Sequence, residues 1–443
     1  MTLSELAKIL KDNGIVGAGG AGFPTYAKLS ERADTIILNC AECEPLLKLH
    51  RQVLKNNTHE IFDTLCLIAE VLGAKDIVIA IKEAYKTTLE AVKAALPAYK
   101  NIRLSLLPEV YPAGDEVVVV YETTKRVVPP GKIPIEVGAI VFNVETIFNV
   151  YKAINKQEPV MYKYITIAGE IEKPITVKAP LGITFEEVLK KAGGITVSDY
   201  ALVNGGPMTG TVACASDVVT KTTNAILVLP KDHNIINKKL SNNKHNMKRA
   251  MSACCQCRMC TDLCSRHLLG HPIKPHEFMR AATSGDTRKL EPFLNTMYCS
   301  GCGICEMYAC MQGLSPRTLI AEYKAGLRRN GIKPSENVEF SEVSPVRDSR
   351  MAPKARVMSR LGLSKYNKAA PIDEEIIKAN KVKIKLSQHI GAPAKPVVKK
   401  GDKVKAGQEI ALAAENALSV NIHASIDGIV TKVDDNFIII SAN

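Results

Sequence analysis

Apolar and polar positions follow two different periods along the first 125 residues. Short apolar runs, typical of buried strands, alternate with stretches whose apolar positions have helical spacing. The expected strands are 34–39 (DTIILN), 76–81 (DIVIAI) and 103–108 (RLSLLP), and the expected helices are 3–14, 60–73, 86–98 and 115–125, the last despite its valines. This alternation predicts an α/β domain with a mostly parallel sheet and helices on its faces.

The pattern changes further along the chain. Residues 164–230 begin with a strand, a turn, a strand and a helix, which suggests a β-grasp unit. The stretch between two later cysteine runs has helical spacing, so we expect an all-helical module there. Short strands around G-D and D-G turns follow at the C-terminus, as in a lipoyl-like barrel sandwich. The fold class is thus multidomain α/β and α+β, with predicted domains at 1–155, 160–232, 240–335 and 379–443 and a basic linker or helix at 336–378.

Length and composition agree with several globular domains. The chain has 443 residues, is 46% hydrophobic and contains no Trp. It has no apolar run long enough to cross a membrane, and its N-terminus lacks the features of a signal peptide. We therefore expect a cytoplasmic protein with no integral membrane segment.

The formal net charge is +13. A lysine-rich solvated surface accounts for it, and an acidic partner or an anionic cofactor is a second explanation. The basic residues are dispersed and lack interleaved aromatics, so we expect no nucleic acid partner. Within the basic segment, KARVMSRLGL (354–363) is expected to pack on its own chain or to dock on a partner.

Nine of the thirteen cysteines fall between Cys254 and Cys310. A disulfide framework fits poorly with a long chain that lacks a secretory signal. The first run has the spacing C-x2-C-x2-C-x3-C and the second has C-x2-C-x2-C-x4-C. In such runs three thiolates surround one iron–sulfur cube and the fourth points to a second cube. The predicted pairing is crossed: Cys254, Cys257, Cys260 and Cys310 hold one [4Fe–4S] cluster, and Cys299, Cys302, Cys305 and Cys264 hold the other.

Zinc is the alternative, but zinc sites favour paired C-x2-C knuckles and do not need a third cysteine at the same interval. Cys255 is an extra cysteine, because only Cys254 keeps the two-residue spacing. Three nearby histidines, His267, His271 and His276, are expected to be capping or surface residues.

A glycine-rich loop at 14–29 (GIVGAGGAGFPTYAKL) is the candidate anion-binding element. Gly17, Gly19 and Gly22 match G-x-G-x-x-G, but a helix precedes them where a dinucleotide-binding turn would follow a strand. The loop still offers backbone N–H groups to an anion, and Lys28 adds charge. A flexible hinge is the alternative interpretation.

Three loops at strand ends carry acids and amides: 39–45 (NCAECEP), 111–116 (YPAGDE) and 141–146 (VFNVET). Ligands of open α/β sheets collect at such edges. The acids are Glu42, Glu44, Asp115 and Glu116; each taken alone is an ordinary loop carboxylate.

Together these motifs resemble the flavin- and NADH-binding subunit of respiratory complex I, and more closely the RnfC subunit of the Rnf electron-transport complex. Longer stretches, such as AECEPLLK, VYPAGDEV, NGGPMTG and CRMCTDLC, are most similar to the cobalamin reductases of propanediol-utilisation microcompartments. The C-terminal position of HIGAPA…HASIDG also matches those reductases, whereas RnfC subunits place that domain before the flavin domain.

The resemblance implies FMN held by the glycine loop with NADH stacked on its ring. It assigns to this pocket Gly17, Gly19, Gly20, Gly22, Phe23, Lys28, Asn39, Glu42, Glu44, Asp115, Glu116 and Asn143. Carboxylates accept hydrogen bonds from ribose and repel a 2′-phosphate, which favours NADH over NADPH. Cys43 stands where complex I has a glycine, which weakens that analogy for NADH.

The resemblance further implies an NADH-dependent oxidoreductase that reduces cob(III)alamin for a B12-dependent diol dehydratase. Cobalamin or a cobalamin-handling enzyme, and microcompartment shell proteins, are the implied partners. The alternatives are an Rnf-type subunit that exchanges electrons with ferredoxin, an electron carrier for another reductase such as an amino-acid reductase, and a non-enzymatic cluster relay. No acid–base residue is required. The stretch AAENALSV has no lysine where a lipoyl or biotinyl carrier would need one, so a docking role is expected for the last domain.

Overall fold

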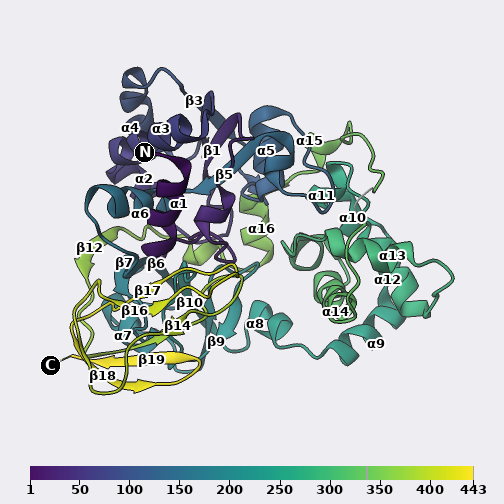
Figure 1. Ribbon diagram of the computed structural model, residues 1–443. Helices are drawn as coiled ribbons and strands as arrows, with labels where there is room; N and C mark the ends of the chain where they lie inside the picture. Colours follow the sequence, from purple (N-terminus) through teal and green to yellow (C-terminus); the bar gives the residue numbers. More distant parts are fainter. Residues whose placement is uncertain (336–337, 443) are drawn as a thin grey trace.

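The structure, a computed structural model, describes residues 1–335 and 338–442 of the chain. An α/β domain, a mixed sheet, a helical module and a pair of small sheets follow one another along the sequence. In Figure 1 the helical module (teal to green) lies to the right of the α/β domain, and the C-terminal strands (yellow) lie below that domain.

The N-terminal α/β domain is built on a four-stranded sheet of strand order β3-β2-β1-β5. All neighbouring strands in it are parallel, which confirms the predicted sheet. Its strands are β1 (Thr35–Cys40), β2 (Asp76–Lys82), β3 (Ile102–Leu107) and β5 (Ala139–Asn143). Its helices are α1 (Leu3–Asp12), α2 (Leu49–Asn56), α3 (Thr58–Leu72), α4 (Lys86–Ala95), α5 (Glu116–Thr124) and α6 (Val144–Asn155).

Helix α5 forms although it begins with valines, which have low helix propensity. Asp115 caps its N-terminus by accepting a hydrogen bond of 3.0 Å from the backbone nitrogen of Val117. Residues 117–120 are all buried, in one apolar cluster with Ile37 and Val78 of the sheet. Burial against the sheet therefore outweighs the propensity of these valines.

The β-grasp unit is a six-stranded mixed sheet of order β12-β7-β6-β10-β8-β9. Its strands are β6 (Tyr162–Gly169), β7 (Ile175–Pro180), β8 (Tyr200–Asn204), β9 (Thr211–Ala213), β10 (Ala225–Pro230) and β12 (Ile372–Ile376). Helix α7 (Phe185–Leu189) starts with a capping box between Thr184 and Glu187. Strand β12 comes from the segment predicted as a linker, so that segment completes the edge of this sheet.

The helical module contains no strand within residues 240–335, all of which the structure describes. After α8 (Asn234–Lys239), its helices are α9 (Asn243–Ala253), α10 (Met259–Asp262), α11 (Ser265–Leu268), α12 (Pro275–Ser284), α13 (Glu291–Leu294) and α14 (Pro316–Arg329). Phe278, Leu319 and Ile320 form its small core. The predicted all-helical character is thus confirmed.

The segment after this module returns to the α/β domain. Strand β11 (Ala352–Pro353) pairs with β4 (Val110–Tyr111), between α15 (Arg347–Arg350) and α16 (Lys354–Arg360). Val357, Leu361 and Leu363 are buried. The apolar side of α16 therefore packs on its own chain, and Figure 1 shows α16 between the α/β domain and the helical module.

The C-terminal domain consists of two small sheets, β13-β19-β18-β15 and β14-β16-β17. The strands are β13 (Lys381–Lys385), β14 (Lys395–Pro396), β15 (Lys403–Val404), β16 (Glu409–Leu412), β17 (Ile422–His423), β18 (Gly428–Val433) and β19 (Phe437–Ser441). The buried Lys221 of the β-grasp unit donates to the carbonyls of Gly14 (2.6 Å) and Asn421 (3.2 Å). One side chain thus joins three domains.

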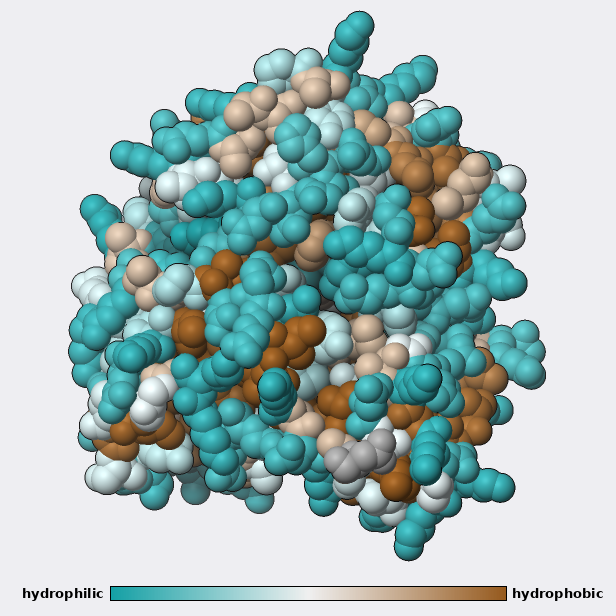
Figure 2. Space-filling view, turned by 90° about the vertical axis from the view of Figure 1, so that its left-hand side faces the viewer, coloured by the Kyte–Doolittle hydropathy of each residue, from teal (hydrophilic) through white to brown (hydrophobic). Residues whose placement is uncertain are grey.

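Hydrophilic side chains dominate the face seen in Figure 2, with hydrophobic patches between them. This face carries the α/β domain and the C-terminal strands. No helix among the described residues is both long enough and apolar enough to span a bilayer.

Candidate functional site

A cavity of about 300 Å³, here called the glycine-loop cavity, opens at the carboxyl edge of the parallel sheet. Strand β1 brings Asn39 to it and strand β5 brings Asn143, while the loop 17–28 forms the opposite wall. Open α/β sheets bind ligands at such an edge. Nine of the residues predicted for the cofactor pocket line it: Gly17, Gly19, Gly20, Gly22, Phe23, Lys28, Asn39, Glu116 and Asn143.

Two glycines of the loop, Gly19 and Gly22, lie too close to their neighbours to carry larger side chains. A Cβ at Gly19 would be 2.5 Å from Nδ2 of Asn143, and Gly22 has a φ of +74°. The hydroxyl of Thr25 lines the cavity, is buried and has no hydrogen-bond partner in the described part of the chain. A close-packed glycine loop and an orphaned polar atom are features that a bound nucleotide would use, so the residues present fit FMN.

Lys28 is the cation of this cavity. Its Nζ donates to Oε1 of Glu116 (2.6 Å) and to the carbonyl of Val141 (3.2 Å). The Glu116 side chain is 46% exposed, so solvent screens this ion pair. Lys28 therefore remains able to exchange its carboxylate partner for a ligand anion.

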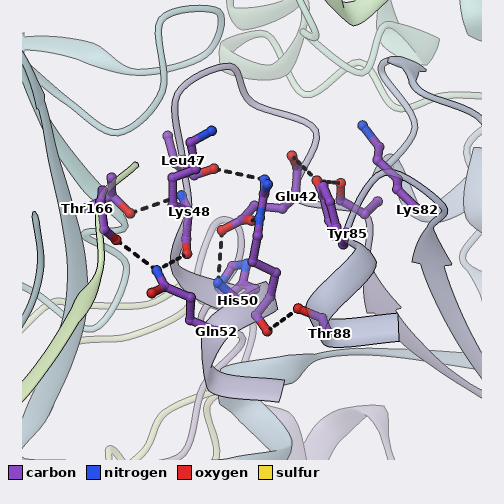
Figure 3. Close-up of polar contacts among 12 residues, drawn as sticks. Glu42, Leu47, Lys48, His50, Gln52, Lys82, Tyr85, Thr88 and Thr166 are labelled. Carbon is purple, nitrogen blue, oxygen red and sulfur yellow. Dashed lines mark hydrogen bonds and ion pairs between the residues drawn. The ribbon is translucent and has the colours of Figure 1, made fainter. Parts of the chain in front are cut away.

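Glu42 is committed to the protein itself. Its carboxylate accepts from Nε of Arg51 (2.6 Å) and from the backbone nitrogen of His50 (2.9 Å), as Figure 3 shows. Burial would raise the pKa of this carboxyl, but Arg51 and His50 together lower it to about 2. Glu42 thus stays ionised while its oxygens fix the start of α2.

Glu44 holds the turn of the β-grasp unit that the sequence NGGPMTG forms. Its carboxylate accepts from the backbone nitrogens of Met208 (2.9 Å) and Thr209 (2.8 Å) and from the Thr209 hydroxyl (2.5 Å). A Cβ at Gly206 would collide with this carboxylate, at 2.1 Å. The turn therefore packs against the α/β domain, and Glu44 joins the two units.

A second cavity, of about 700 Å³ and here called the interdomain cavity, adjoins the glycine-loop cavity. The two share lining residues, among them Gly19, Gly20 and Asn143. Glu42 and Glu44 line the interdomain cavity, as do Ser300 and Gly301 of the second cysteine run. The space beside the glycine loop thus extends to the helical module.

A buried polar network lies next to both cavities and was missed by the sequence analysis. Glu145 and Lys163 form a wholly buried ion pair, and Nζ of Lys163 also donates to Oδ1 of Asn224 (2.8 Å). His50 lies 3.9 Å from Glu145, and burial lowers its pKa to about 4. His50 is therefore neutral at pH 7. The only local signal was a lysine in the otherwise apolar strand β6.

The thiols of the first predicted cluster lie together. Cys254, Cys257, Cys260 and Cys310 line one cavity of the helical module. Burial, followed by the nearby thiols of Cys310, Cys254 and Cys257, raises the pKa of Cys260 to about 12. The chain thus places the fourth cysteine of the second run with the first run, which is the crossed arrangement expected from the spacing.

The remaining four thiols form a second group. Burial raises the pKa of Cys264 to about 11, and the thiol of Cys299 contributes to this rise. Burial also raises the pKa of Cys305, with further contributions from Cys299, Cys302 and Cys264. Residues 305–309, where this run ends, form a π-helical turn, a feature often found at functional sites.

The three nearby histidines differ in their surroundings. The backbone and ring nitrogens of His276 contact the Thr261 hydroxyl. His271 is buried, with Nε2 2.9 Å from the Val128 carbonyl, and Nδ1 of His267 has no partner in the described residues. In the part of the chain that the structure describes, no three His, Cys, Asp or Glu side chains are placed to share a single metal ion.

Two contacts fix the second cysteine group against the α/β domain. Arg266, two residues after Cys264, forms a bidentate ion pair with Asp115 at 2.8 and 3.1 Å. The Tyr111 hydroxyl donates to the carbonyl of Cys302 (2.5 Å). Asp115 was predicted for the cofactor pocket, but it lines neither of the two cavities and instead binds the helical module.

Comparison with protein-family models divides the chain in the same order as the fold. Residues 10–152 match the Nuo51 FMN-binding domain and 164–212 match the SLBB domain. Residues 253–315 match a 4Fe-4S dicluster domain, and 361–442 match the RnfC barrel sandwich hybrid domain. The β-grasp and barrel-sandwich predictions are thereby confirmed, together with FMN-binding and iron–sulfur domains.

Two curated relatives are similar over nearly their full length. The cobalamin reductase PduS of Citrobacter freundii is 39% identical over 96% of this chain and 94% of that protein. The cobalamin reductase PduS of Salmonella typhimurium is 38% identical over 99% of this chain and 96% of that protein. A subunit of the proton-translocating ferredoxin:NAD(+) oxidoreductase complex from Clostridium ljungdahlii is 30% identical, over 60% of this chain and 57% of that protein.

Among solved structures, a chain of an NAD+-reducing [NiFe]-hydrogenase in the air-oxidised state is similar in fold. The TM-score is 0.50 at 18% identity, covering 81% of this chain and 67% of that chain. This likeness concerns the fold alone. The nearly full-length relatives and the FMN-binding and 4Fe-4S domains show that the chain is an electron-transfer oxidoreductase, and it belongs to the cobalamin reductase PduS family.

Proposed function

We propose that this chain transfers electrons from NADH, by way of FMN and two [4Fe–4S] clusters, to cob(III)alamin. One observation carries the proposal: the glycine-loop cavity adjoins a larger cavity whose lining includes Ser300 and Gly301, which lie between Cys299 and Cys302 in the sequence. The interdomain cavity thus borders both the proposed flavin site and the second cysteine run, so donor, flavin and cluster can lie close to one another. The names of the nearly full-length relatives supply the acceptor.

The glycine-loop cavity is the proposed FMN site. Gly17, Gly19 and Gly20 offer their backbone to the ligand, Lys28 offers a cation, and Asn39 and Asn143 line the cavity from the strand ends. When bound there, FMN would accept a hydride and pass on single electrons. The protein's part is to orient donor and cofactor.

NADH is the proposed donor, and the interdomain cavity is its proposed site. Glu44 lines this cavity and forms no ion pair within the described residues. Arg317 also lines the cavity and Lys239 lies within reach of the Glu44 charge, so the preference for NADH over NADPH rests on the two carboxylates of Glu42 and Glu44 in the same lining.

Two [4Fe–4S] clusters are proposed for the two thiol groups, with the crossed ligand sets given above. The group of Cys264, Cys299, Cys302 and Cys305 is anchored to the α/β domain through Arg266 and Tyr111. The cavity of the other group is lined only by residues of the helical module. We therefore propose that electrons pass from the flavin to the group of Cys264, Cys299, Cys302 and Cys305, and from there to the group that contains Cys254.

The overall reaction is NADH + 2 cob(III)alamin → NAD⁺ + H⁺ + 2 cob(II)alamin. Each cobalamin takes one electron, so the relay converts a two-electron donor into one-electron steps. In this proposal the chain works in the cytoplasm inside a bacterial microcompartment, near a B12-dependent diol dehydratase and shell proteins, as its family resemblance implies.

Anaerobically isolated holoprotein tests the proposal. We expect a flavin spectrum that bleaches with NADH, followed by reduction of the clusters and then of added cob(III)alamin. A colourless protein with zinc as its only metal would contradict it.

Ferredoxin is the control acceptor, because the matched Clostridium relative is named as part of a ferredoxin:NAD(+) oxidoreductase complex. If the reduced protein passed electrons to ferredoxin and left cob(III)alamin oxidised, the acceptor in this proposal would be wrong.

A further inference from the structure

A separate cavity, of about 340 Å³ and here called the exit cavity, lies beside the first cysteine group. It opens between α8, α9, α16 and the loop that carries Cys310. Cys310 and Met311 line both this cavity and the cavity of the first group. A molecule bound in the exit cavity would therefore lie directly against the loop that supplies a ligand of the cluster farther from the flavin.

The exit cavity is positively charged. Lys238, Arg249 and Arg360 line it, and none of the three forms an ion pair with a carboxylate of the described residues. The one acid of the lining, Glu306, is buried and accepts from the backbone nitrogen (2.9 Å) and hydroxyl (3.0 Å) of Thr318. The cavity thus presents three cations whose charge its own acid balances only in part.

Two of these cations are held in place by the cysteine loop. Nζ of Lys238 donates to the Gly313 carbonyl (3.1 Å), and Nη2 of Arg360 donates to the Cys310 carbonyl (3.2 Å). Both side chains keep further N–H donors for a ligand. The planar guanidinium group of arginine can donate two parallel hydrogen bonds to phosphate oxygens, so Arg249 and Arg360 suit a phosphate group.

Carboxamides complete the lining, from Asn234, Asn237 and Asn246. Cobalamin carries one phosphodiester and several peripheral carboxamides on its corrin ring, and these groups would pair with arginines and asparagines respectively. The cavity is at the lower end of the size range for small-molecule pockets, so a corrinoid can insert only one edge.

We propose that the exit cavity binds the phosphodiester-bearing edge of a cob(III)alamin and is the place where electrons leave the chain. The inference rests on the proposed function and adds the acceptor site to it. A cluster held by Cys254, Cys257, Cys260 and Cys310 would supply one electron to Co(III) bound there, giving Co(II), and a second such transfer would complete the oxidation of each NADH.

Binding of cob(III)alamin and of cobinamide to the oxidised holoprotein tests this site. Cobinamide keeps the corrin ring but lacks the nucleotide loop with its phosphodiester. The test variant is Arg249→Gln/Arg360→Gln, whose side chains are both exposed, so folding should be kept. The matched control is Arg280→Gln/Arg356→Gln, which removes two exposed arginines outside the cavity and gives the same net charge.

We expect Kd for cob(III)alamin, measured by equilibrium dialysis, to rise about tenfold in the test variant, as loss of charge-assisted hydrogen bonds at a partly exposed site implies. Cobinamide binding and the control variant should stay unchanged. Unchanged cob(III)alamin binding, an equal loss for cobinamide, or no binding by the parent would overturn the exit site. NADH-driven reduction of flavin and clusters is measured separately. If the parent showed no such reduction, the proposed function would be wrong. If reduction persisted while cob(III)alamin binding was not affected as expected, only the exit site would be wrong.

Discussion

Two adjacent cysteines, Cys254 and Cys255, differ in their surroundings, although exposure alone does not identify a ligand, because the proposed ligand Cys257 is exposed too. Cys254 is half-buried and packs against the core of the helical module, whereas Cys255 is exposed. The thiols that act on Cys260 are those of Cys310, Cys254 and Cys257. The neighbourhood of Cys260 thus agrees with the two-residue spacing, and both support Cys254 as the proposed ligand, while Cys255 lines the same cavity.

Replacing one proposed ligand should remove one cluster. We expect Cys257→Ala to lower the iron content by about half and to leave FMN bound, because its cluster would have three protein ligands and the flavin site lies in another domain. Iron and flavin in the anaerobically purified protein are the measurements. Cys255→Ala is the matched control and should keep both. An iron content in Cys257→Ala equal to that of the parent would refute this ligand assignment.

At the scale of elements, the two acids of the loop after β1 stabilise neighbouring elements in addition to lining a cavity. Glu42 fixes the start of α2, and Glu44 fixes the β-grasp turn at 206–209. Both side chains still line the interdomain cavity, so they shape its wall while their oxygens are occupied by protein donors.

Glu44→Ala should therefore act first on stability. It leaves two backbone N–H groups and one hydroxyl without their acceptor, which costs about 1–3 kcal/mol. We expect a lower urea midpoint with FMN still bound. Glu116→Ala is the control, since the Glu116 side chain is 46% exposed in a solvent-screened ion pair and its loss should change stability by no more than about 0.5 kcal/mol. If Glu44→Ala weakened NADH binding without any shift of the midpoint, Glu44 would be a ligand residue alone.

The elements that could be predicted from the sequence are those with a local pattern of apolar residues or cysteines. Short apolar runs located three of the four strands of the parallel sheet, all but β5, and helical spacing located the all-helical module. Cysteine spacing gave two groups that the fold brings together in the crossed arrangement. It could not find β12, which joins the β-grasp sheet from 372–376, because pairing across two hundred residues leaves no local pattern. The His50–Glu145–Lys163 network was missed for the same reason: each partner comes from a different element.

At the scale of the whole molecule, the cavities and cysteine groups adjoin one another. The glycine-loop cavity shares lining residues with the interdomain cavity, which reaches the second cysteine run, and the exit cavity shares Cys310 and Met311 with the cavity of the first group. This arrangement depends on how the helical module is seated on the α/β domain. Arg266 and Tyr111 make the polar contacts between the helical module and the α/β domain, and Leu269 adds an apolar contact within the core of the α/β domain.

Arg266→Gln should separate the two halves of the relay. The Arg266 and Asp115 side chains are 17% and 8% exposed, so the ion pair is largely shielded and its loss leaves a poorly solvated carboxylate. We expect NADH to bleach the flavin at the parental rate, since the glycine-loop cavity lacks Arg266, while the following reduction of the clusters becomes slower. Anaerobic stopped-flow spectra resolve the two steps.

The control for this variant is Arg280→Gln, an exposed arginine of the same module, which should leave both steps unchanged. Iron content must also equal that of the parent, so that a slow second step reports the distance between domains and not a missing cluster. Equal slowing of both steps in Arg266→Gln would mean that the ion pair acts on the flavin pocket itself. An unchanged second step would mean that Tyr111 and the apolar contact seat the module without the ion pair, and the electron path would then tolerate the loss of its strongest polar link.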